Sequence, residues 1–113
     1  MENILKQSLL YDFYGELLTE HQRAVYEDVV FQDMSLGEIA QERGISRQGV
    51  HDLVKRCDRI LEGYEEKLHL VSKFERTRQM VKEIQQRLRS FRETEDKRLI
   101  TEIEQISADI MDL

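Results

Sequence analysis

A short segment, residues 35–54, holds residue types that can read base pairs in a nucleic acid. Its sequence is SLGEIAQERGISRQGVHDLV. The second half carries Arg47, Gln48 and His51, and Lys55 follows directly. Arginine can form two hydrogen bonds to guanine, glutamine can do the same with adenine, and lysine pairs with phosphate. These side chains can act together only if the chain presents them on one exposed helix face.

The segment has the spacing of two helices joined by a tight turn. Ser35 and Glu38 can form a capping box that starts the first helix. Gly44 can take the positive φ that ends this helix, and Ser46 can cap the second, so the turn is three residues long. Ala40 supplies the small side chain that a helix-turn-helix needs where its helices cross. The joint pattern predicts a helix-turn-helix motif, with an ordinary helical hairpin as the alternative.

The outward face of the second helix is the candidate nucleic-acid surface, because the N-terminal residues of a recognition helix meet the major groove. We expect Val50 and Leu53 to turn toward the core. The predicted nucleic-acid contacts on the opposite face are Ser46, Arg47, Gln48, His51 and Lys55. Asp52 shares this face, where it would repel phosphate or accept from cytosine. A solvated polar face without a ligand is the alternative interpretation.

The composition predicts an all-α protein. Of the 113 residues, 35% are charged and 7% are aromatic, and proline is absent. The longest apolar run is far shorter than the roughly 20 residues that cross a bilayer. The N-terminal segment lacks the basic start of a signal peptide, and one cysteine forms no internal disulfide. We therefore expect a cytoplasmic protein that is not inserted in a membrane.

Two helices are predicted before the motif. The first covers about residues 2–17. Its apolar stripe is expected to consist of residues four positions apart: Leu5, Leu9, Phe13 and Leu17. Thr19 caps the second helix, and Gln22 completes its capping box.

The C-terminal half predicts a long recognition helix followed by a helical extension. The apolar pattern that begins at Val50 continues to about Val71. Further helices are expected over about residues 74–91 and from Glu95 onward. The last helix has aliphatic residues at alternating steps of four and three: Leu99, Ile103, Ile106, Ile110 and Leu113.

This pattern predicts two parts of the chain. Residues 1–72 form a helix-turn-helix domain, and residues 73–113 form an extension that packs on the same domain. A homodimer held by the extension is the alternative. It would set two recognition helices about 34 Å apart, the spacing of successive major grooves.

Charge is distributed unevenly along the chain. The net charge is −6, yet residues 1–33 carry −5 and residues 73–92 carry +5. An acidic chain argues against strong non-specific DNA binding, which depends on cations that neutralise phosphates. Candidate contacts to RNA or to an acidic protein are the cations of the basic stretch, in which Arg78 also lies: Lys73, Arg76, Lys82, Arg87, Arg89 and Arg92. A solvated helix face is the alternative.

The sequence has no pattern for metal, cofactor or enzyme chemistry. The histidines, His21, His51 and His69, are far apart in the sequence, and no second cysteine accompanies Cys57. Cys57 lies on an apolar stripe and is predicted to be a small buried residue. No glycine-rich phosphate loop is present. We expect a protein without a metal or cofactor that is not an enzyme.

Two resemblances add to this interpretation. Residues 18–62, from LTEHQRAVY to CDRILE, resemble the C-terminal DNA-binding region of bacterial sigma factors. The whole chain, from LYDFYGELLTEHQ through DMSLGEIAQERGISRQGVHDLVKRC, resembles the YlxM family of small bacterial proteins. The YlxM resemblance implies an all-helical, sigma-like fold. It also implies a part in the signal recognition particle (SRP) pathway, because the family's gene neighbours that of the particle's GTPase.

The expected function is therefore a helix-turn-helix regulatory protein that binds DNA and is linked to the SRP pathway. The alternative is an interaction protein that does not bind DNA. It would modulate the SRP GTPase, or bind SRP RNA through the basic stretch at residues 73–92.

Overall fold

The computed structural model describes residues 2–113, with side chains from Ile4 onward. The described residues form six α-helices and one 3-10 helix, and none of them lies in a strand. The expected all-α class is confirmed. The chain divides into two compact units, Met1–His69 and Leu70–Leu113.

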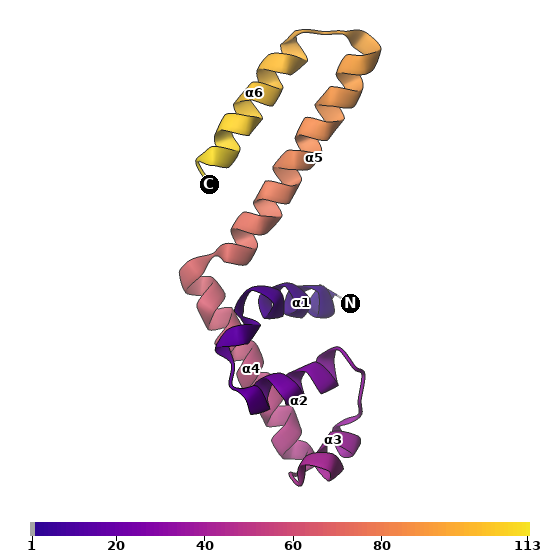
Figure 1. The fold of residues 1–113 in the computed structure, drawn as a ribbon, viewed down its shortest axis with the longest axis vertical. Helices are drawn as coiled ribbons and strands as arrows, with labels where there is room; N and C mark the ends of the chain where they lie inside the picture. Colours follow the sequence, from indigo (N-terminus) through magenta and orange to yellow (C-terminus); the bar gives the residue numbers. More distant parts are fainter. Residues whose placement is uncertain (1) are drawn as a thin grey trace. The chain divides into compact units, whose positions relative to one another are not determined.

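The first unit is built around one long helix (Figure 1). Its elements, in order, are α1 (Glu2–Tyr14), the 3-10 helix η1 (Gly15–Leu17), α2 (Glu20–Val30), α3 (Leu36–Arg43) and α4 (Arg47–Leu68). The α1, α2 and α3 helices all pack against α4. The 22-residue α4 buries Val50, Cys57 and Leu61 completely along this shared side.

The two predicted capping boxes are confirmed. The Thr19 hydroxyl accepts from the Gln22 backbone N–H at 3.2 Å, and the Gln22 side chain accepts from the Thr19 N–H at 3.0 Å. Ser35 and Glu38 make the same pair of bonds, at 3.1 and 3.3 Å, at the start of α3. The boxes satisfy backbone donors that lack partners within their helices, which fixes where α2 and α3 begin.

The predicted apolar stripe of α1 is wrong by one position. Leu5 is 70% exposed and Leu17 is 55% exposed, whereas Leu10, Tyr14 and Leu18 are buried. The buried residues have the same four-residue spacing, shifted by one position, and they include a tyrosine. The α-helix also ends at Tyr14, so the 3-10 turn that follows moves Leu17 out of phase.

Tyrosine hydroxyls bond the N-terminal helices to their neighbours. Three of them donate to a carboxylate on another helix: Tyr11 to Glu27, Tyr14 to Glu65 at 2.5 Å, and Tyr26 to Asp58 at 2.7 Å. Burial is the main cause that raises the pKa of Tyr26, and the hydrogen bond to Asp58 adds to it. Because a buried hydroxyl without a partner is costly, these bonds allow aromatic rings to fill the core.

The long helix ends close to its predicted position. The last residue of α4 is Leu68, and His69 takes a left-handed conformation with φ 56°. The second unit consists of α5 (Leu70–Thr94) and α6 (Arg98–Met111), which run antiparallel, side by side (Figure 1). The packing of residues 73–113 on the helix-turn-helix domain stays a prediction.

Two glycines allow a test of the backbone conformation that ends α3. Gly44 has φ 68°, and Gly63 lies inside α4; a Cβ built on either glycine meets nothing within 4 Å. We expect Gly44→Ala to lower the free energy of unfolding by about 1 kcal/mol, because alanine disfavours a left-handed backbone. Gly63→Ala should instead raise it by about 0.5 to 1 kcal/mol, because alanine favours the helix. Urea denaturation followed by circular dichroism measures both changes, and equal effects would contradict this account.

Candidate nucleic-acid interface

The turn between α3 and α4 has the predicted helix-turn-helix geometry. The α3 helix ends at Arg43 and α4 begins at Arg47, which leaves three residues between them. Gly44 is left-handed, and the Ile45 N–H donates to the Ala40 carbonyl at 3.1 Å. This bond satisfies a carbonyl at the end of α3 and reverses the chain within the turn.

The side chains predicted to join the two helices lie beneath this turn. Ile39 and Val50 are fully buried, and Ala40 is 9% exposed, in a core cluster that also contains Val25 of α2. Ile45 and Leu53 pack against the same cluster. With this side of α4 buried, its opposite side faces solvent.

The predicted nucleic-acid contacts share the first turns of that solvent-facing side. All five are exposed: Ser46, Arg47, Gln48, His51 and Lys55. The hydroxyl oxygen of Ser46 accepts from the Gly49 N–H at 2.9 Å, so Ser46 caps α4 as predicted. The structure therefore places these side chains together on one capped helix.

Asp52 contacts two of the candidate base-reading residues. The Gln48 amide donates to an Asp52 carboxylate oxygen at 2.9 Å, and His51 Nδ1 lies 3.7 Å from the same oxygen. For Gln48 to present both groups of its amide to adenine, its bond to Asp52 must break.

Arg47 is placed by a contact that the sequence did not reveal. A Cβ built on Gly37 of α3 would lie 2.9 Å from Arg47 Nη2 and 3.1 Å from its Nε. The guanidinium therefore lies directly over Gly37, where any larger residue would displace it. No spacing rule signals this contact, because it joins residues on two different helices.

The cations of the basic stretch lie along the length of α5. Six of its seven cations are exposed: Lys73, Arg76, Arg78, Lys82, Arg89 and Arg92. Arg87 differs, because it is half-buried, lies 3.4 Å from Glu102 of α6 and donates to the Glu83 carbonyl. The Arg78 guanidinium lies over the Phe74 ring, 5.7 Å from its centroid. Arg87 therefore has a structural role in the α5–α6 hairpin.

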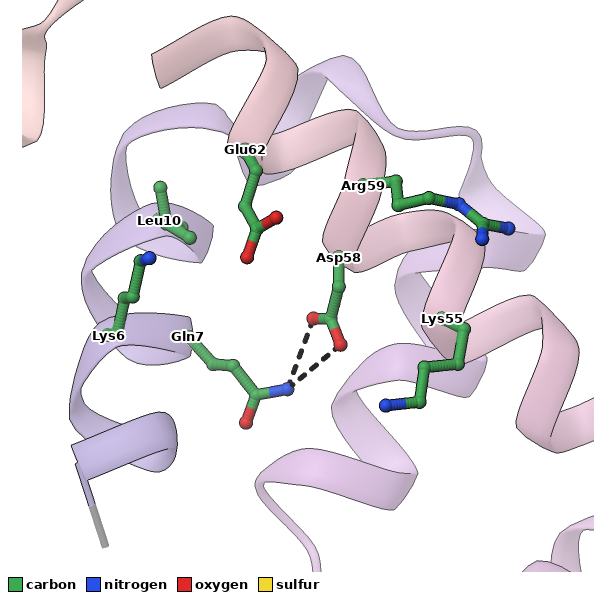
Figure 2. Close-up of a pocket in the computed structure, with 7 residues that line it drawn as sticks. All are labelled: Lys6, Gln7, Leu10, Lys55, Asp58, Arg59 and Glu62. Carbon is green, nitrogen blue, oxygen red and sulfur yellow. Dashed lines mark hydrogen bonds between the residues drawn. The ribbon is translucent and has the colours of Figure 1, made fainter. Parts of the chain in front are cut away.

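A polar cleft lies between α1 and α4, next to the candidate interface. It has a volume of about 400 Å³ and is lined by Lys6, Gln7, Leu10, Lys55, Asp58, Arg59 and Glu62 (Figure 2). Lys55 belongs to both surfaces. Arg59 was not a predicted site residue, although its position four residues after Lys55 signals that it shares the same side of α4.

The thiol of Cys57 is fully buried in the core. Burial is the main cause that raises its pKa to about 11, and the neighbouring charge of Asp58 adds to it, while Arg56 opposes it. Side chains that could hold a metal ion do not gather in threes anywhere in the described part of the chain. None of the helices described is long and apolar enough to cross a membrane.

The fold and the three-residue turn between α3 and α4 define a helix-turn-helix protein. A family model described as "Putative helix-turn-helix protein, YlxM / p13 like" matches residues 1–105. The chain belongs to this family, UPF0122, and the resemblance to YlxM proteins is confirmed.

Proteins from several bacteria are similar to this chain. A UPF0122 protein of Thermoanaerobacter sp. (strain X514) is 42% identical over 113 residues, covering 99% of this chain and 97% of its own. One from Halalkalibacterium halodurans is 43% identical over 86 residues, covering 76% and 79%. Another, from Desulforamulus reducens, is 51% identical over 74 residues, covering 66% and 63%.

The buried thiol generates a prediction about pH. In the folded protein the pKa of the Cys57 thiol is about 11. In the unfolded chain a cysteine thiol has a pKa of about 8.5. Between these two pKa values the folded state binds more protons than the unfolded state. The free energy of unfolding should therefore fall as pH rises above about 8.5. Urea denaturation at several pH values measures this slope. Cys57→Ala should reduce it between about pH 8.5 and 10, and an unchanged slope would contradict the assignment.

Proposed function

We propose that this protein is a DNA-binding regulatory protein that places the first turns of α4 in the major groove. Arg47, Gln48 and His51 contact base edges, while Ser46 and Lys55 contact phosphates. The observation that supports this role is their common exposure on a capped helix, directly after a three-residue turn. Residues at this end of a recognition helix reach the bases.

The charge of the chain affects how such a protein would select its sites. The net charge of −6 weakens the sequence-independent attraction to phosphate. Binding then depends more on hydrogen bonds to bases, which carry the sequence information. Asp52 strengthens this dependence, because it repels phosphate and holds Gln48 until a better partner is present.

The second unit supports a homodimer as part of this proposal. Residues 73–92 of α5 carry a net charge of +5, and residues 95–113, which include α6, carry −4. Val81 and Leu88 of α5, seven residues apart, and Ile100 of α6 are exposed. A second copy, with its α6 against this α5, would pair opposite charges and cover these side chains.

A second candidate role is an action on the signal recognition particle, which the YlxM resemblance implies. The exposed cations of α5 favour it, because five of them form no ion pair with any described residue: Lys73, Arg76, Lys82, Arg89 and Arg92. Such cations can pair with RNA phosphates or with an acidic surface of the GTPase.

Selection of DNA from a random-sequence pool tests the first role. After a preferred sequence is found, Arg47→Ala should cost about 1 to 3 kcal/mol of binding and relax the preference at one base pair. Lys67→Ala, at the far end of α4, is the control and should leave the preference intact. A dimer should select paired half-sites about 10 base pairs apart. Failure to enrich any sequence would contradict base readout.

Added protein should change the rate of GTP hydrolysis by a reconstituted particle and its receptor if the second role holds. We expect the double variant Arg89→Glu, Arg92→Glu to lose that effect while its thermal unfolding stays the same, because both side chains are exposed. Arg87→Glu is the matched variant, and it should lower stability because Arg87 pairs with Glu102. No effect of the unmodified protein on hydrolysis would exclude this role.

A further inference from the structure

The exposed side of α4 continues beyond the candidate base-reading residues. Arg47, His51, Lys55 and Arg59 follow one another at four-residue steps, so each is the neighbour of the next on the exposed side of the helix. At 1.5 Å per residue, Lys55 and Arg59 lie about 12 and 18 Å along the axis from Arg47. The major groove is about 12 Å wide. A helix that enters it by its N-terminal end therefore brings Lys55 and Arg59 level with the bordering phosphates.

The α1 helix adds a third cation at this level. Lys6 lies across the α1–α4 cleft from Lys55 and Arg59 (Figure 2). All three are exposed, and none forms an ion pair with a described residue. Figure 2 shows the Arg59 guanidinium pointing outward from α4, while Lys55 extends toward Gln7. Because these cations form no ion pair with a described residue, pairing with an external anion breaks no existing ion pair.

The two carboxylates of the cleft are not equivalent. Asp58 accepts from the Gln7 amide at 3.1 Å and from the buried Tyr26 hydroxyl at 2.7 Å, so the fold already uses its oxygens. Glu62 lies one turn further along α4 and forms no ion pair with a described residue. Its charge disfavours an anion at that end, which leaves the position near Lys55 as the better one for a phosphate.

We propose that Lys6, Lys55 and Arg59 form a seat for the phosphate backbone of duplex DNA at the edge of the major groove, in which Lys6 on α1 and Arg59 on the outer side of α4 contact different phosphates. Lys6 and Arg59 are the residues that this adds to the interface. The seat fixes the position and tilt of α4 in the groove without reading sequence, as phosphate contacts do. The inference rests on the proposed entry of α4 into the major groove.

Fluorescence anisotropy with a short labelled DNA duplex of random sequence, across a potassium chloride series, tests this seat. Lys6→Gln and Arg59→Gln should each weaken binding roughly three- to tenfold at low salt and reduce the slope of log affinity against log salt by about one. Glu62→Gln should strengthen binding, because it removes a negative charge from the cleft. Lys67→Gln, which makes the same charge change outside the cleft, is the control and should have little effect.

The outcomes separate this inference from the function on which it rests. If the unmodified protein binds but Lys6→Gln and Arg59→Gln behave like Lys67→Gln, the seat is wrong and DNA binding stands. A lack of binding by the unmodified protein at any salt concentration would overturn both. A double-stranded RNA of the same length is titrated as a comparison, because side chains cannot read its deep, narrow major groove. Equal losses on both duplexes would overturn the assignment to DNA.

Discussion

The first unit depends on the reversal of the chain at Gly44. Because this residue is left-handed and the side chain of Ala40 is small, α3 can cross close to α4, which brings Ile39 and Val50 into one core. Burial of this side of α4 leaves a polar side to the solvent. The exposure of the candidate nucleic-acid contacts is thus a consequence of how the core is packed, and no separate interaction is needed to present them.

Local signals in the sequence predicted the local structure well. Ser35, Thr19 and Gly44 fixed helix starts and a helix end because capping bonds and a positive φ involve only residues a few positions apart. The stripe of the first helix was predicted one position out, because the buried set includes Tyr14, whose hydroxyl reaches Glu65. A partner that is distant in the sequence made a polar aromatic residue suitable for the core.

The contacts between helices could not be predicted from the sequence alone. The position of the Arg47 guanidinium over Gly37, and of Lys6 across the cleft from Lys55, depends on how α3 and α1 are placed against α4. The difference between Arg87, which pairs with Glu102, and the exposed cations around it also depends on the α6 helix. Residue types and spacing identified the face of α4, and the fold determined which neighbours share it.

The hydrogen bond between Tyr26 and Asp58 links the protein's interior to its charged cleft. Tyr26 is wholly buried, so its hydroxyl relies on that carboxylate, which also forms part of the cleft wall. Replacing Asp58 by a residue without a side-chain acceptor, such as alanine or lysine, would make the cleft more positive but would leave a buried donor unsatisfied. The charge of this surface can therefore be changed through Glu62, Lys6 or Arg59 without the loss of a core hydrogen bond, whereas a change at Asp58 acts on the charge and on the core together.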